Sequence, residues 1–307
     1  MSTLPNSALS APAEPSQPST REVEGALPRS QALRIWHKFR GNPLALAGGI
    51  LVAFFISVAV LAPVLAPFDP LKTDFMAVRQ PPSLTWWFGT DELGRDIFSR
   101  MLFGARASLA AGVLSVVIGL LIGVPLGLVA GYFGRWVDTA ISRVIDALLS
   151  IPFLVLAIAM AACLGPSLVN AMIAIGVSAA PRFARVARGQ AMSVAAEEYV
   201  QSARALGASD LRIIVRHILP NVAAPLIVQA TITVATAIIA EASLSFLGLG
   251  LQPPAASWGS MLSTGKGFMM QAPWMSIFPG AAIFLVVLGF NLLGDGARDA
   301  FDPRQQQ

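Results

Sequence analysis

The sequence predicts an all-α polytopic membrane protein with six transmembrane helices. Apolar residues make up 55% of the 307 residues and charged residues only 12%, about half the usual share of a soluble domain. Five long stretches also lack any Asp, Glu, Lys or Arg, at 41–68, 107–134, 147–181, 217–240 and 267–294. A membrane-spanning helix needs about 20 apolar residues, so each stretch is long enough to cross the bilayer.

The third stretch, 147–181, predicts two helices rather than one. As a single helix it would extend about 50 Å, which exceeds a hydrocarbon core of about 30 Å. Gly165 and Pro166 lie near its middle and favour a tight turn outside the membrane. The predicted spans are therefore 43–66, 107–131, 143–164, 167–184, 221–245 and 275–295.

The distribution of Lys and Arg predicts that both termini are cytoplasmic, because cytoplasmic segments of membrane proteins are enriched in these residues. With the N-terminus inside, fifteen basic residues fall in inner segments and six in outer ones. Five of those six lie in the outer segment 67–106, where five acidic residues balance them. Residues 1–33 are rich in Ser, Pro and Ala, and they predict a disordered cytoplasmic tail rather than a cleaved signal.

The second span carries a small residue at every fourth position. These residues are Ala111, Ser115, Gly119, Gly123, Gly127 and Gly131. Such spacing leaves a smooth groove along a helix and lets a neighbouring backbone approach closely. The last four positions are therefore predicted to be helix-packing residues, with a structural role rather than a chemical one.

Acidic residues within or beside the spans are few, and each costs about 3 kcal/mol at the bilayer centre. Asp146 and Glu241 are the two candidates. Glu241 begins the stretch EASLSFLGLG near the outer end of the fifth span. Two interpretations remain open for it: an interfacial helix cap, or a lining of the translocation path together with Ser243.

The sequence shows no catalytic, metal-binding or nucleic-acid-binding pattern. The two histidines, His37 and His217, lie at predicted inner membrane edges, and Cys163 is the single cysteine, which excludes an intrachain disulfide. Lys266 is flanked by glycines, but the rest of a phosphate-binding loop is missing around it. We therefore expect a non-enzymatic chain with no metal and no cofactor of its own.

The segment 198–221, EYVQSARALGASDLRIIVRHILPN, predicts two short amphipathic helices that meet at Gly207. Helical spacing places apolar residues on one face of each helix, at 199, 200, 203 and 206 and at 211, 214, 215 and 218. Ser209 predicts a helix cap, and Pro220 predicts the start of the next span. This periodicity alone favours equally a loop packed on its own helices and a loop that docks a partner.

The stretch QSARALGASDLRIIVRHILP resembles the EAA loop of ATP-binding-cassette importer permeases. Gly207, Leu219 and Pro220 match that pattern, whereas Gln201 and His217 depart from it. Three further stretches are similar to the C-type permease of dipeptide and oligopeptide importers: FRGNPLALAGG before the first span, GTDELGRDIFSRMLFGARASL at 89–109, and EASLSFLGLGLQPPAASWGSML at 241–262. Nickel, glutathione and cationic-peptide importers share these stretches, so the resemblance leaves the substrate open among them.

The resemblance implies a type I permease fold in the bacterial inner membrane. Residues 34–104 would form the first transmembrane helix and an outer loop, and residues 105–304 the transmembrane domain with a cytoplasmic coupling loop at 198–220. The implied partners are a homologous second permease, two ATPase subunits that hold ATP and Mg, an extracytoplasmic solute-binding protein and membrane lipid. The implied ATPase-coupling residues are Gln201, Ser202, Ala203, Arg204, Leu206, Gly207, Ala208, Leu219 and Pro220.

A stand-alone ion-coupled carrier or channel is the alternative from another class. Such a protein needs ligands for a coupling ion, or broken helices in paired positions near the midplane. The few charges within the spans and the exposed segment 198–221 favour the importer permease instead.

Overall fold

The structure, a computed structural model, describes residues 42–301, so the predicted tail at 1–33 lies outside the described residues. The regular secondary structure of the described part consists of helices and one isolated bridge between Thr90 and Asp96, which confirms the all-α class. The longer helices are α2 (Pro43–Leu65), α3 (Ile97–Phe133), α4 (Arg135–Leu149), α5 (Phe153–Leu164), α6 (Leu168–Ala195), α7 (Glu198–Ala205), α8 (Asp210–Ile213), α9 (Leu219–Phe246), α10 (Trp258–Gly265) and α11 (Trp274–Phe301). Three short turns are η1 (Phe75–Ala77), η2 (Ile214–Ile218) and η3 (Lys266–Phe268).

Four of the described helices are continuous, long and apolar enough to cross a membrane, namely Pro43–Leu65, Ile97–Phe133, Asp210–Phe246 and Trp274–Ala300. A fifth candidate is the pair α4 and α5, which are bent by 90° relative to each other. Helix α6 is not among the candidates, because three arginines interrupt the second half of its sequence. The predicted number of six spans is therefore not confirmed.

One predicted span is broken in the structure, and one helix extends beyond its predicted span. The predicted third span, 143–164, is broken after Leu149, because Pro152 has no N–H to donate and disfavours helical geometry in the residue before it. Helix α3 begins at Ile97, ten residues before the predicted start at 107, so it continues through the predicted unit boundary at 104–105. The segment that connects α2 and α3 comprises residues 66–96, and it is here called the outer segment after the side of the membrane predicted for it.

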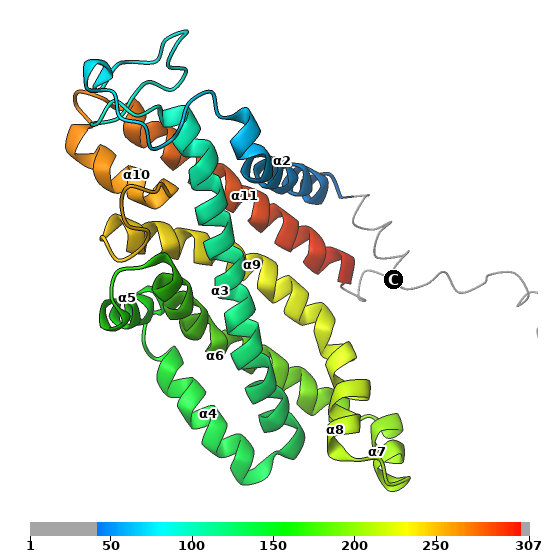
Figure 1. The fold of residues 1–307 in the computed structure, drawn as a ribbon. Coiled ribbons are helices and arrows are strands. Elements are labelled where there is room, and N and C mark those ends of the chain that lie inside the picture. The colour runs from blue at the N-terminus through cyan, green and yellow to red at the C-terminus, as the bar shows by residue number, and fades with distance from the viewer. Residues whose placement is uncertain (1–41, 302–307) are drawn as a thin grey trace, which may run out of the picture.

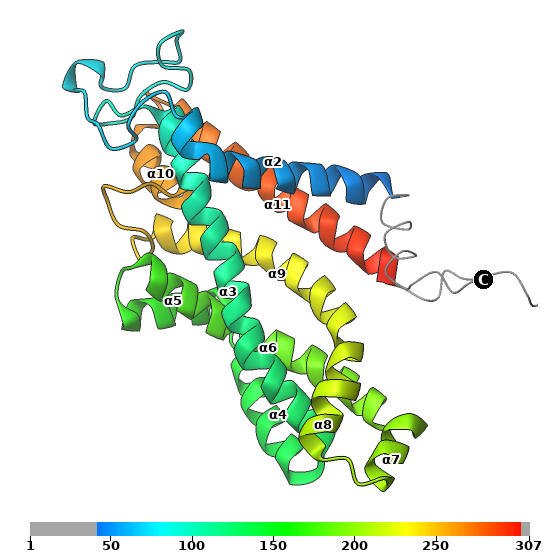
Figure 2. The same ribbon diagram turned by 45° about the vertical axis from the view of Figure 1, so that its right-hand side comes forward.

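Helix α3 extends along the molecule and contacts most of the other long helices (Figure 1). Helices α2 and α11 lie side by side in both views, and α4, α5 and α6 pack together on another side of α3 (Figure 2). One end of the molecule, here called the α7 end, carries α7, α8 and the end of α3. The opposite end, here called the α10 end, carries residues 66–96, α10 and the beginning of α11.

The most extensive helix contact joins α3 to α6 through the small residues of the second span. A Cβ atom built on Gly123 or Gly127 would lie closer than 3.0 Å to the backbone oxygen of Ala180 or Ala184. In a membrane, helices associate through close van der Waals packing rather than through a hydrophobic driving force between them. The glycines therefore give α3 and α6 a contact that any side chain would prevent.

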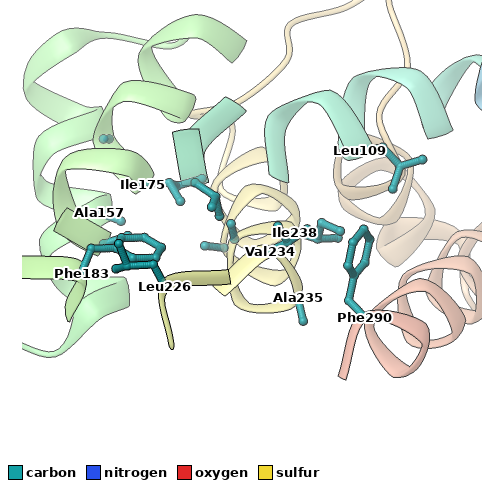
Figure 3. Packing of buried hydrophobic residues seen from close by; sticks show 14 of the residues in the cluster. Leu109, Ala157, Ile175, Phe183, Leu226, Val234, Ala235, Ile238 and Phe290 are labelled. Carbon is teal, nitrogen blue, oxygen red and sulfur yellow. The ribbon is translucent and has the colours of Figure 1, made fainter. Parts of the chain in front are cut away.

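The buried core lies where α9 crosses between α3, α6 and α11 (Figure 3). Phe183 and Ile175 of α6, Ile238 of α9 and Phe290 of α11 belong to it, with Leu109 of α3. Each of these side chains is buried within the chain itself. The core therefore joins four helices that are far apart in sequence into one packed unit.

Candidate functional site

The α7 end is built around a turn at Gly207. Helix α7 ends in two hydrogen bonds typical of a glycine-terminated helix: the Gly207 N–H donates to the Arg204 carbonyl (3.0 Å) and the Ala208 N–H to the Ala203 carbonyl (3.1 Å). Gly207 has φ +81°, which residues with a side chain rarely adopt. A Cβ at this position would meet nothing within 4 Å. The glycine is therefore required for its backbone conformation and not for space.

The helix that follows Gly207 is not separate from the next span. Helix α8, the π-helical turn η2 and α9 follow one another without a break over Asp210–Phe246. The α-helix α9 itself begins at Leu219 with Pro220 in its first turn, as the sequence predicted. A proline has no N–H and its ring crowds the preceding turn, and the wider π-helical turn lets the chain pass it without a break. Ser209 occupies the cap position, but its side chain makes no capping hydrogen bond.

The apolar faces in this segment differ from the predicted ones. The structure buries Val200, Ile213 and Ile218, whereas Leu206 is 89% exposed and Leu211 is 72% exposed. The π-helical turn explains the second helix, because it places residues five apart, rather than four apart, on one face. The predicted faces are therefore wrong in part, and the α7 end presents exposed apolar side chains.

The predicted coupling residues all lie on this segment. Gln201, Ser202, Arg204, Leu206, Gly207 and Pro220 are exposed, and Ala203, Ala208 and Leu219 are half-buried. The Gln201 side-chain amide donates to the Ala196 carbonyl (3.1 Å) and therefore stays on its own helix. Their role in coupling stays a prediction.

Tyr132, the penultimate residue of α3, contacts both sides of the Gly207 turn. Its hydroxyl donates to Oδ1 of Asp210, the first residue of α8, at 2.6 Å. The Arg204 guanidinium of α7 lies 4.9 Å from the centre of the Tyr132 ring. Tyr132 is 8% exposed. Sequence reasoning did not identify this tyrosine, because it lies in an apolar stretch and its partners are more than 70 residues away.

Helices α4 and α6 are joined by charged pairs at the same end. Arg188 forms an ion pair with Asp138, in which its Nη2 lies 2.7 Å from Oδ2. Asp146, one of the two acidic candidates, pairs with Arg185 at 2.8 Å, and both side chains are exposed. These pairs hold the amphipathic helix α4 against the second half of α6.

Glu241, the other acidic candidate, is fully buried at the junction of α3, α9 and α10. The hydroxyls of Ser245 and Ser108 donate to its two carboxyl oxygens, at 2.7 and 3.2 Å. The Trp258 N–H at the start of α10 donates to the same Ser108 oxygen at 3.3 Å. Ser243 instead donates to the Ile239 carbonyl of its own helix at 2.8 Å. That these two residues line a path stays a prediction.

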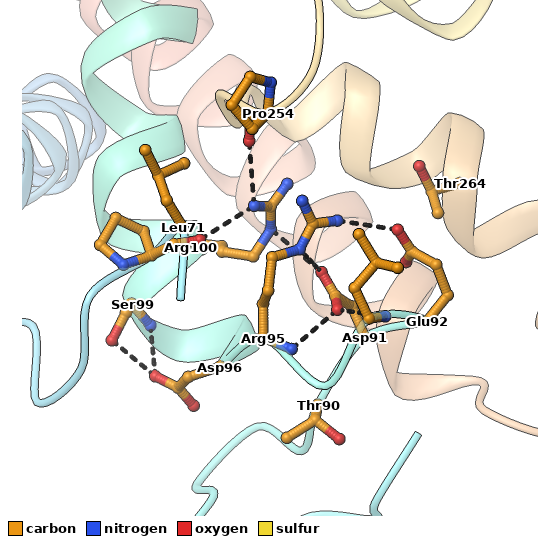
Figure 4. A network of polar contacts seen from close by, with 12 residues as sticks. Leu71, Thr90, Asp91, Glu92, Arg95, Asp96, Ser99, Arg100, Pro254 and Thr264 are labelled. Atoms are coloured by element: carbon orange, nitrogen blue, oxygen red, sulfur yellow. Dashed lines mark hydrogen bonds and ion pairs between the residues drawn. The ribbon is translucent and has the colours of Figure 1, made fainter. Parts of the chain in front are cut away.

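A buried network centred on Asp91 organises the α10 end (Figure 4). Asp91 accepts from the Arg95 backbone N–H (2.9 Å) and from Nε of the same arginine (2.6 Å), and its carboxylate lies 3.3 Å from Arg100 Nε. Arg95 also bonds Glu92 at 2.8 Å, and Arg100 reaches the Pro254 carbonyl at 3.3 Å. This Asp91 network therefore joins the outer segment, α3 and the loop before α10.

Aromatic contacts fix the outer segment on α11. The Phe88 and Phe278 rings stack with their centres 4.0 Å apart, and the Trp274 indole N–H donates to the Thr90 carbonyl (3.2 Å). Asp96 begins α3 by accepting from the Ser99 N–H at 2.8 Å. The charges and turns of this segment show no regular period, so the sequence predicted only a loop here. Among residues 42–301, no group of three or more His, Cys, Asp or Glu side chains is placed to hold a metal ion.

Two known protein families match parts of this sequence. Residues 123–307 match the family described as the binding-protein-dependent transport system inner membrane component. The chain belongs to this family. Residues 30–82 also match the N-terminal transmembrane domain of oligopeptide transport permease C. The resemblance seen in the sequence is therefore confirmed, and the chain is a multi-pass inner-membrane permease.

Several relatives of this permease align over most of its length. The dipeptide transport system permease protein of Alkalihalophilus pseudofirmus is 47% identical over 95% of this chain and 96% of the relative. The glutathione transport system permease protein of Pectobacterium atrosepticum is 45% identical, over 88% and 90%. The probable D,D-dipeptide transport system permease protein of Escherichia coli K12 is 44% identical, over 93% and 97%.

Among solved structures, the permease shares its fold with an inward-facing methionine ABC transporter, MetNI. The TM-score is 0.53 at 23% identity, and the match covers 65% of this chain and 95% of the other. The type I permease fold is therefore confirmed. The family match and the named relatives show that the chain is a permease subunit of an ABC importer. These findings do not support the alternative of a stand-alone carrier or channel.

Proposed function

We propose that this permease moves dipeptides or short oligopeptides into the cell as one of two homologous permease subunits. Relatives named for dipeptide, D,D-dipeptide and glutathione transport, at 44–47% identity, support a small peptide-like substrate. Nickel chelates and cationic peptides are the other substrate classes that the sequence left open. A separate extracytoplasmic solute-binding protein would deliver the substrate to the permease pair.

The observation that carries this proposal is the form of the α7 end. Leu206 beside the Gly207 turn and Leu211 on α8 are both largely exposed, and apolar side chains exposed together mark a surface that binds a partner. We assign this surface to the ATPase subunits, which would hold ATP and Mg. The chain itself would be non-catalytic and would carry no cofactor.

The same assignment orients the molecule. The α7 end would face the cytoplasm, in agreement with the excess of Lys and Arg in the predicted inner segments. The start of α2 and the end of α11 lie together, since the Asn42 side-chain amide donates to Asp299 (3.1 Å), and both would be cytoplasmic. The α10 end, with its Asp91 network, would face the solute-binding protein.

Reconstitution of the complete importer tests this function. The permease, its partner permease, the two ATPases and the solute-binding protein are placed in liposomes, and uptake of labelled dipeptide, glutathione and a nickel chelate is compared. We expect ATP-dependent uptake of dipeptide that requires the loaded solute-binding protein. A single cysteine at Leu206, in a Cys163→Ser background, should crosslink to an ATPase subunit. Uptake of the nickel chelate alone, or crosslinking to the solute-binding protein, would contradict the proposal.

A further inference from the structure

We infer that Tyr132 is the positioning residue through which movement of the α7–α8 segment reaches α3. This inference rests on the proposed function, in which the ATPases bind that segment. It adds a specific path inside this chain: a tyrosine hydroxyl held by Asp210 and a tyrosine ring held under Arg204.

The placement of the two partners is the first argument. Arg204 lies on α7 just before the Gly207 turn, and Asp210 lies at the first position of α8 just after it. Tyr132 touches both, by the 2.6 Å hydrogen bond and the 4.9 Å guanidinium–ring contact. A displacement of either helix next to the turn therefore acts on the same side chain of α3.

The scarcity of other links is the second argument. Within residues 42–301, the Tyr132 hydroxyl makes the one side-chain hydrogen bond that joins α3 to residues 198–218. The acceptor is a carboxylate, and hydrogen bonds to charged groups are stronger than neutral ones. Tyr132 is nearly buried although Asp210 and Arg204 are exposed, so the ring anchors an otherwise accessible segment.

The rigidity of α3 is the third argument. The helix continues without a break for 37 residues through Pro125, and Gly123 and Gly127 on either side of that proline pack against the α6 backbone. Close-packed contacts transmit displacement rather than absorb it. At the far end of α3, Arg100 enters the Asp91 network. A shift that begins at Tyr132 is therefore carried along α3 toward the α10 end.

The experiment uses the complete importer in liposomes and compares small changes to the two side chains of the hydrogen bond. Tyr132→Phe keeps the ring beneath Arg204 and removes the hydroxyl, Asp210→Ala removes the acceptor, and Asp210→Asn keeps a carbonyl oxygen that can accept. Tyr199→Phe is the matched control, because its hydroxyl is close to the Asn221 side-chain amide (3.2 Å) on α9 and not to α3. The readouts are hydrolysis stimulated by the loaded solute-binding protein, and peptide uptake per ATP hydrolysed.

We expect Tyr132→Phe and Asp210→Ala each to lower stimulated hydrolysis and uptake about tenfold, the scale of one hydrogen bond to a charged group. The double variant should be no worse than either single variant, and Asp210→Asn should recover most of the loss. Wild-type stimulation in Tyr132→Phe, or additive losses in the double variant, would overturn the inference. If Tyr132→Phe does not assemble, the comparison of Asp210→Ala with Asp210→Asn still tests the inference, because only the asparagine keeps an oxygen that can accept the hydrogen bond. Failure of the wild-type importer to couple hydrolysis to uptake would instead contradict the proposed function.

Discussion

Gly123 of α3 packs directly against the carbonyl oxygen of Ala180 in α6, so close that no Cβ atom fits between them. The next small residue of the stripe, Gly127, meets Ala184 in the same way one turn later. This repeated contact gives the α3–α6 pair its short separation, and it makes the pair sensitive to any added atom.

Gly123→Leu should destabilise the permease. Overpacking a close contact costs about 1–3 kcal/mol, and here the obstacle is backbone, which cannot rotate away. Thermal unfolding in detergent should show a lower midpoint for the variant. Leu121→Ile is the control, because Leu121 is exposed on the same helix. An unchanged midpoint for Gly123→Leu would show that α3 and α6 do not pack as described.

Gly207→Asp should abolish most transport while the protein still inserts and assembles. The positive φ of Gly207 is a conformation that residues with a side chain rarely adopt, and the aspartate adds a charge beside the exposed leucines. Uptake and stimulated ATP hydrolysis are measured in the assembled importer. Gly189→Asp is the matched control, because this glycine of α6 is also exposed and has open space around it. Near wild-type uptake by Gly207→Asp would exclude the turn from coupling.

Substitution of Asp91 should be more costly than substitution of Asp146. Asp91→Asn leaves Arg95 and Arg100 buried beside a neutral group, and breaking a buried pair costs about 3–5 kcal/mol. Asp146→Asn breaks an exposed pair with Arg185, which contributes about 0–1 kcal/mol. Thermal unfolding of the two variants checks this difference. Equal midpoints would mean that water solvates the Asp91 network and that the network contributes little to stability.

The pH dependence of stability should report on Glu92. Burial, and next the charge of Asp91, raise the pKa of Glu92 above its usual 4.5. A carboxyl with a raised folded pKa binds its proton more tightly in the folded state, so folding loses stability as the pH rises through this range. Between about pH 4 and about pH 7, the unfolding midpoint of Glu92→Gln should therefore rise progressively relative to that of the wild type. A constant difference across that range would contradict the assigned shift.

Cysteine labelling should define the orientation. In a Cys163→Ser background, a cysteine at Ala205 should react with an impermeant thiol reagent only from the cytoplasm, and one at Ala255 only from outside. Both positions are exposed and lie at opposite ends of the molecule. Labelling of position 205 from outside would invert the proposed arrangement.

The class of the protein and the place of the segment 198–220 could be predicted from the sequence alone. Long stretches without charge require helices, because lipid offers no partner to a backbone N–H or carbonyl. The small-residue spacing at 119–131 predicted a close contact because four residues complete about one helical turn. Gly207, Leu219 and Pro220 placed the segment 198–220 within a known loop pattern, and their spacing is a property of the chain alone.

Three features depend on the tertiary structure: where helices break, which helix faces are buried, and which side chains distant in sequence come into contact. Pro152 lies at a break in a predicted span, whereas Pro220 follows the π-helical turn η2 inside a continuous helical path, and the presence of a proline alone does not distinguish the two cases. The α-helical period predicted that Ile218 is buried but not Ile213, since η2 changes the spacing of residues along the helix. Tyr132 looks like one more apolar position in the sequence, and only folding brings its hydroxyl to Asp210. Contacts between residues so far apart depend on how helices pack, which no local pattern encodes.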